Sequence, residues 1–187
     1  LTPIPPERIV ATQEGARLQL GPRSFEFLHT PGHALHHHCI VDTAANAVFT
    51  GDTFGLSYRE FDVDGRPFVM PTTAPTQFDP DPLHASIDRI LARRPRALYL
   101  THFGEVGDVE RLGRELHDGI RAFVAIARRH VHTPGRAQAM RDDMFRWLSV
   151  ALDAHGYTGD RATRHALLDV DVELNVQGLI HWLDHRT

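Results

Sequence analysis

The chain has 187 residues, a formal net charge of −4 and a single cysteine. This length allows one domain with a hydrophobic core, while the acidic charge argues against nucleic acid as the partner. No run approaches the roughly 20 apolar residues that span a bilayer, so we expect no membrane segment. All 20 basic residues are arginines, which excludes a Schiff-base lysine and a P-loop lysine. Cys39 cannot form an internal disulfide, so a reducing cytoplasm is the expected compartment.

The first hundred residues are predicted to form short strands and one helix. Apolar runs bounded by turn residues predict strands over 17–20, 25–28, 36–42, 47–50 and 97–101. Turn-forming residues lie at 21–23 and 42–46, between the first two strands and between the third and fourth. An amphipathic helix over 82–93 precedes the last strand. This order of elements indicates an α/β fold.

A long segment without periodicity, residues 54–80, separates the fourth strand from that helix. Loops beyond about 12–15 residues are uncommon in compact domains and usually have a function. Four of the ten phenylalanines lie here, which is unusual for a disordered segment. We therefore expect a packed lid beside a ligand crevice; a structural loop or a dimer contact is the alternative. The candidate substrate contacts in this segment are Phe54, Tyr58 and Arg59.

Beyond residue 105 the apolar pattern changes to the three- and four-residue steps of helices. One long helix is predicted over 109–131 and ends at a Thr-Pro-Gly segment. A second helix is predicted to end near Gly156. A third covers about 161–183, with an interruption at 169–171 left open. We therefore divide the chain into a segment at 1–104 and a helical extension at 105–187 that packs on it.

Three side chains that commonly bind metals each follow an apolar, strand-like run. His33 follows residues 25–32, Asp52 follows 47–51, and His102 follows 97–101. Loops that leave the same edge of a sheet converge on one crevice. A lone histidine at a strand end is usually a surface or hydrogen-bonded residue, but here three independent loops agree. Two imidazoles and one carboxylate predict a site for a first-row metal ion.

These segments resemble the third, fourth and fifth metal motifs of the metallo-β-lactamase superfamily. The motifs are Thr-Pro-Gly-His at 30–33, Phe-Thr-Gly-Asp at 49–52 and Leu-Thr-His at 100–102, and their order and spacing match. His37 resembles the second histidine that is common four residues after the first. The resemblance covers about residues 5–104. It implies half of an αββα sandwich, with a mixed sheet and helices, followed by a C-terminal helical extension.

The resemblance also implies a metal-dependent hydrolase with a binuclear centre. Zinc is the first expectation, and iron or manganese are the alternatives. By this resemblance His33 would bind one metal, His102 would bind the other, and Asp52 would bridge both and position the attacking hydroxide. His37 would lie behind these ligands and orient one of them. A metal-bound hydroxide would attack an ester, lactone, amide or thioester bond of a small-molecule substrate.

One motif of the family is missing from this chain. The His-x-His-x-Asp-His motif of the first half has no counterpart, although His-x-His occurs at 36–38 and at 130–132. We therefore expect a truncated domain whose partner is the missing N-terminal half or a second copy in a homodimer. The alternatives are a catalytically incomplete fragment that acts as an association scaffold, one half of a split enzyme, and an iron-dependent oxidative relative.

Overall fold

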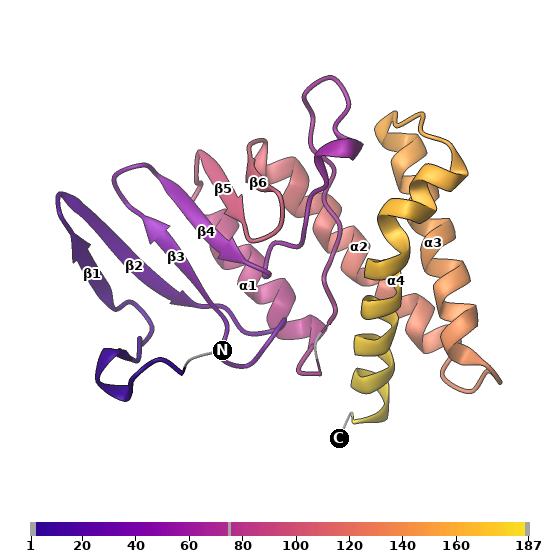
Figure 1. The fold of residues 1–187 in the computed structure, drawn as a ribbon, viewed down its shortest axis with the longest axis horizontal. Coiled ribbons are helices and arrows are strands. Elements are labelled where there is room, and N and C mark those ends of the chain that lie inside the picture. The colour runs from indigo at the N-terminus through magenta and orange to yellow at the C-terminus, as the bar shows by residue number, and fades with distance from the viewer. Residues whose placement is uncertain (1–2, 75, 186–187) are drawn as a thin grey trace.

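The computed structural model describes residues 3–74 and 76–185, which form one mixed sheet and four α-helices (Figure 1). The strands are β1 (Arg17–Leu20), β2 (Arg23–His29), β3 (His38–Asp42), β4 (Ala47–Gly51), β5 (Ala97–Leu100) and β6 (Gly104–Val106). The helices are α1 (Pro80–Ala92), α2 (Val109–Arg129), α3 (Arg136–His155) and α4 (Arg161–Asp184). The five predicted strands and four predicted helices are confirmed, and α4 runs without the interruption left open at 169–171.

The six strands lie in the sheet in chain order. Neighbouring strands are antiparallel except β4 and β5, which are parallel. A parallel pair needs a long crossover connection, and here residues 52–96, including α1, provide it. Because β2, β4 and β5 consequently run in the same direction, the chain leaves all three at one edge of the sheet. The predicted metal ligands follow these three strands.

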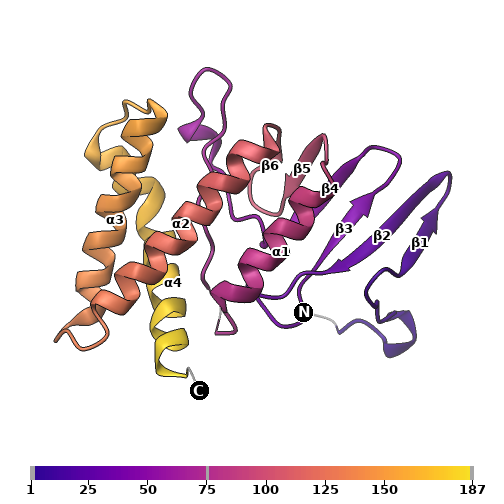
Figure 2. The ribbon, with the colours of Figure 1, turned by 180° about the vertical axis from the view of Figure 1, so that it is seen from behind.

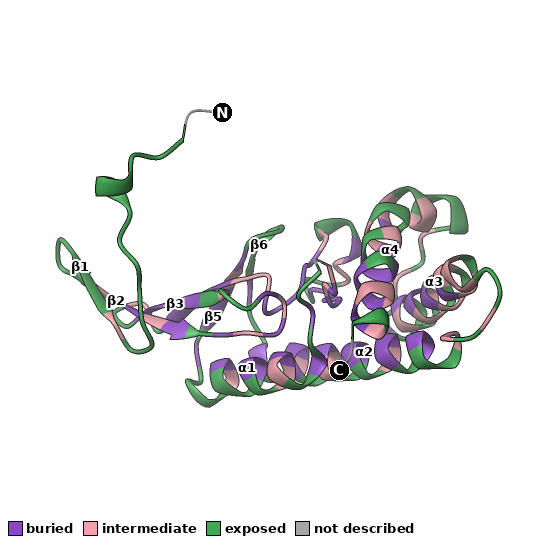
Figure 3. Ribbon diagram, turned by 90° about the horizontal axis from the view of Figure 1, so that it is seen from below, coloured by how far each residue is buried: buried purple, intermediate pink, exposed green. Residues whose placement is uncertain are grey.

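Helices α1 and α2 cover one face of the sheet (Figures 2 and 3). Side chains alternate between the two faces of a strand, and those that face the helices are buried. In β3 and β4, for example, Cys39, Val41 and Val48 are at most 7% exposed. Leu83 and Ile87 of α1 pack into the same core. The amphipathic pattern predicted for this helix therefore matches its position.

The opposite face of the sheet carries no α-helix within the described residues (Figure 3). Leu18 and Phe49 lie on this face and are 53% and 42% exposed. Direct register partners share a face, which places Phe25 beside Leu18 and Tyr99 beside Phe49. The rings of Phe49 and Tyr99 stack with their centroids 5.1 Å apart. We call this surface the open sheet face.

Helices α2, α3 and α4 pack together beside the sheet (Figure 1). One hydrophobic cluster joins the sheet, the 54–80 segment and these helices. The segment is packed, because Phe61 and Phe78 are 0% and 3% exposed. Its residue Thr73 is held by Asn175 of α4. None of the helices in the described part of the chain is long and apolar enough to cross a membrane.

Candidate metal centre

The structure brings His33, Asp52 and His102 together at one edge of the sheet. Nε2 of His33 lies 3.6 Å from Oδ2 of Asp52, and Nε2 of His102 lies 3.3 Å from Oδ1. Each imidazole therefore faces a different oxygen of the same carboxylate. An aspartate is suited to this position because its two oxygens can serve two neighbouring ions.

The chemistry of this trio agrees with metal binding. Oδ1 of Asp52 is buried and has no hydrogen-bond partner, which is costly for a carboxylate oxygen unless a cation contacts it. In the part of the chain that the structure describes, no three histidine, cysteine or acidic side chains converge around one point. The arrangement therefore corresponds to a carboxylate between two positions, each with one imidazole. A complete ligand set for either position requires groups beyond these three.

His33 is oriented from behind by the 54–80 segment. Its Nδ1 lies 3.4 Å from the carbonyl oxygen of Thr72 and 3.2 Å from the hydroxyl of the same residue. When Nδ1 donates to Thr72, the lone pair of Nε2 remains available on the side of Asp52. Burial lowers the pKa of His33, although the nearby charge of Asp52 opposes the effect. The neutral ring that a metal ion requires is therefore favoured.

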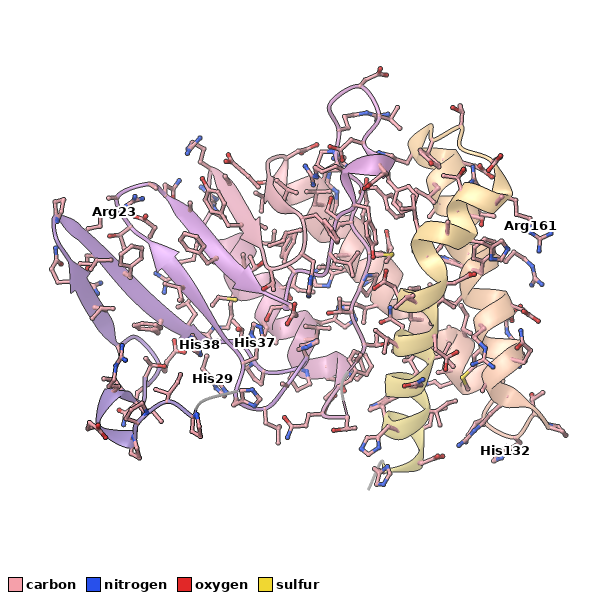
Figure 4. The ribbon with its side chains drawn as sticks, viewed as in Figure 1. Arg23, His29, His37, His38, His132 and Arg161 are labelled. Atoms are coloured by element: carbon pink, nitrogen blue, oxygen red, sulfur yellow. The ribbon has the colours of Figure 1, made fainter. Side chains whose placement is uncertain are left out.

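His37 lies behind Asp52 and fixes its backbone. Nε2 of His37 accepts the backbone N–H of Asp52 at 3.0 Å, while Nδ1 lies 3.0 Å and 2.9 Å from the hydroxyls of Thr30 and Thr53. Burial, reinforced by His33, lowers the pKa of His37 to about 4. The ring is therefore neutral, and both nitrogens are engaged in positioning the loop. Figure 4 shows His37 near the junction of β2 and β3.

Gly51 makes the close approach of His37 possible. Its φ of 51° lies in the left-handed region, which glycine adopts without strain. A Cβ at this position would collide with the ring of His37. Steric contact with His37 therefore explains why a glycine precedes Asp52. The neighbouring histidines His36 and His38 are exposed, and the latter makes an edge contact with Phe27.

A cavity of about 420 Å³ adjoins the trio and extends to α4. Tyr58 lines it, together with Leu56, Thr72 and Ala74 from the same segment. The other two predicted contacts lie elsewhere. Phe54 is in the core and is 0% exposed. Arg59 is exposed and donates to Ser57 and to the carbonyl oxygen of Glu105.

Four further lining residues were missed in the sequence: Phe103, Asp171, Leu174 and Asn175. Three of them belong to α4, about 70 residues beyond the last metal motif. The signal available was the polar pair at 169 and 171, where the sequence left open an interruption of the helix. A larger cavity of about 660 Å³ lies between α3 and the start of α4, where Figure 4 labels Arg161, and contains none of the predicted site residues.

Comparisons with known proteins identify the family and the fold of this chain. The model of the metallo-β-lactamase superfamily matches residues 1–102. An archaeal protein of this superfamily from Sulfolobus tokodaii has a similar structure, with 18% identity and a TM-score of 0.57, covering 92% of this chain and 52% of its own. A metallo-β-lactamase family protein from Thermus thermophilus has 18% identity and a TM-score of 0.58, and the match covers 96% of this chain and 50% of that protein.

A β-lactamase domain protein from Burkholderia ambifaria has 19% identity and a TM-score of 0.53, and the match covers 91% of this chain and 50% of that protein. The chain thus spans about half the length of these solved structures. The comparison with curated proteins found no match. The family match covers more than half of the chain, and the sheet with its helices has the same fold as these structures. The chain therefore belongs to the metallo-β-lactamase superfamily.

Proposed function

We propose that this chain contributes to a metal-dependent hydrolase that cleaves an ester, lactone, amide or thioester bond in a small molecule. The observation that carries the proposal is the pair of contacts at Asp52, in which each oxygen faces one imidazole nitrogen at 3.3 or 3.6 Å. His33 and His102 would each hold one cation, and Asp52 would hold both. Zinc is the first candidate, with iron and manganese as alternatives. A bound cation of this kind supplies an acidified water and polarises a carbonyl oxygen.

The residues of this chain would prepare the site for that chemistry. The bond to Thr72 keeps Nε2 of His33 free, and His37 holds the backbone of Asp52. Packing of the 54–80 segment against α4 forms one side of the cavity. Apolar side chains such as Leu56 and Leu174 line the cavity and would contact the apolar part of a substrate.

The proposed activity is tested with the zinc-loaded chain and a panel of aryl ester, lactone and thioester substrates. Asp52→Asn keeps the shape of the side chain but removes its charge. We expect this variant to lose activity by about 100-fold or more, because a metal ligand is weakened. Asp169→Asn, an exposed change on α4, is the matched control and should retain full activity. Equal activity of Asp52→Asn and the wild type would overturn the proposal.

A second candidate is a chain that is catalytically incomplete on its own. It is favoured by the finding that, among the described residues, no three histidine, cysteine or acidic side chains are placed to hold a single metal ion. In that case the chain acts as one half of a split enzyme or as an association scaffold. Activity that appears only after a second protein is added supports the split enzyme. Oxygen consumption by the iron-loaded chain would instead indicate the oxidative alternative.

We propose that this partner, either an N-terminal half with the His-x-His-x-Asp-His motif or a second copy of the chain, binds the open sheet face. Exposed apolar patches of this kind mark interaction surfaces. Phe49→Asp would place a charge in the middle of the face, and Val150→Asp, at a 62% exposed position on α3, is the control. Light scattering should show a dimer that only Phe49→Asp dissociates. A chain that is monomeric before mutation would exclude the homodimer.

A further inference from the structure

The part of the cavity wall formed by α4 contains a carboxylate that the proposed chemistry does not use. Asp171 of α4 accepts a hydrogen bond from the hydroxyl of Tyr58 at 2.5 Å, and both side chains line the cavity together with His102. Only one oxygen of Asp171 is engaged by this bond. The carboxylate therefore retains an oxygen that can serve a ligand in the cavity.

The charge of Asp171 has no cationic partner among the described residues. The ion pairs of this part of the chain join other acids to arginines or histidines, and Asp171 is in none of them. Burial raises the pKa of Asp171, while the bond from Tyr58 and the proximity of His102 act in the opposite direction. Burial and the charge of Asp171 also raise the pKa of Tyr58, so its hydroxyl keeps the proton and remains the donor. A half-buried carboxylate without a counter-ion is a favourable place for a cationic group.

Aromatic rings lie beside this carboxylate. Phe103 and Tyr58 pack with their ring centroids 4.4 Å apart, and both line the cavity. Phe103 is 46% exposed, which leaves much of its ring open to a ligand. Its φ of 79° is a strained backbone conformation for a bulky residue, and such strain concentrates at functional sites. The fold therefore holds an exposed aromatic side chain against the tyrosine that contacts Asp171.

We propose that Asp171, Tyr58 and Phe103 bind an ammonium group, and that the substrate carries such a group on one side of its scissile carbonyl. A carboxylate neutralises the charge of an ammonium ion, and aromatic ring faces attract it through their quadrupoles. A quaternary or tertiary ammonium of the choline type matches both features. An anionic group would be repelled by Asp171. The binding of the ammonium group stands on these three residues, whereas its role in a substrate rests on the proposed function.

Binding is tested directly with choline and with 3,3-dimethylbutan-1-ol, which has nearly the same shape but no charge. Calorimetric or ligand-observed NMR titration of the purified chain should show choline binding about tenfold more tightly than the alcohol. Asp171→Asn should abolish this preference, and Phe103→Leu should weaken choline binding several-fold. Asp169→Asn removes a charge from the exposed surface of the same helix and should change nothing. Circular dichroism establishes that each variant is folded.

Equal affinity for choline and the alcohol, or a preference that persists in folded Asp171→Asn, would overturn the inference. So would the absence of choline binding to the wild type. A hydrolysis assay separates this inference from the proposed function. Zinc-loaded chain is given acetylthiocholine and its uncharged analogue 3,3-dimethylbutyl thioacetate. Hydrolysis of both thioesters at equal rates would contradict the ammonium inference and support the proposed function. Selective choline binding without hydrolysis of either thioester would support the ammonium inference and contradict the proposed function.

Discussion

The contact between Thr73 and Asn175 joins the 54–80 segment to α4 and can be tested by mutation. Oδ1 of Asn175 accepts the backbone N–H of Thr73 at 2.5 Å and lies 2.8 Å from its hydroxyl. Asn175 and Thr73 are 3% and 0% exposed, so water cannot replace these bonds. Gly178, one turn further along α4, allows the approach because a Cβ there would collide with the carbonyl oxygen of Thr73.

Asn175→Ala removes the acceptor and leaves the buried N–H of Thr73 without a partner. A stranded buried donor costs about 1–3 kcal/mol, and the loss of packing brings the expected decrease in the free energy of unfolding to about 2–4 kcal/mol. The hydroxyl of Thr73 keeps a partner, since it can still donate to the backbone carbonyl of residue 175 at 2.9 Å. The expected decrease in stability therefore reflects one unpaired donor, the backbone N–H of Thr73, and does not include its hydroxyl.

Urea denaturation followed by tryptophan fluorescence measures this change. With a typical slope of about 2 kcal/mol per molar urea, the midpoint should fall by roughly 1–2 M at an unchanged slope. Gln177→Ala is the matched control, because Gln177 is on the exposed side of α4 and its side chain donates to Glu173 on the same helix. It should change the stability by less than about 0.5 kcal/mol. A midpoint for Asn175→Ala equal to that of Gln177→Ala would refute the reasoning.

Three further predictions concern the site, the core and the dependence on pH. Gly51→Ala should displace the ring of His37 and lower zinc affinity by about tenfold or more, as measured by competition with a chromophoric chelator. Burial raises the pKa of the Cys39 thiol to about 11, so the folded chain should not react with a thiol reagent at pH 8 until urea unfolds it. The bond from His130 lowers the pKa of Asp143 below its ordinary 3.8. Its stabilising effect should be complete above pH 3.8 and lost at lower pH, so thermal unfolding of Asp143→Asn should depend less on acid than that of the wild type.

Much of the fold could be predicted because its local signals are strong. The strand at 17–20 was predicted at its observed bounds, and the stripe of apolar residues that begins at Val109 placed α2 correctly. The helix at 82–93 begins two residues earlier, at Pro80, because Asp79 caps it and accepts the N–H of Asp81. The strand predicted from residue 36 begins at His38, because the preceding residues form a turn closed by a bond between the backbones of His37 and Ala34.

Other features depend on contacts between distant segments. Strand β6 has only three residues, too few for a pattern, and exists because it pairs with β5. The meeting of the three loops at the candidate metal centre could be predicted from strand order, since His33, Asp52 and His102 each lie within four residues of the end of a strand. Asp171 could not, because its place in the cavity depends on how α4 packs against the 54–80 segment. The division at residue 104 remains a prediction, and one hydrophobic cluster extends across it.

The most direct test of the central claim is the zinc affinity of the purified chain compared with that of Asp52→Ala. Other histidines, such as the stacked pair His181 and His185, can bind zinc weakly, so the difference between the two proteins is the quantity that matters. We predict that Asp52→Ala loses the tightest binding event in a calorimetric titration, while Asp169→Asn retains it. Identical zinc isotherms for the wild type and Asp52→Ala would contradict the account.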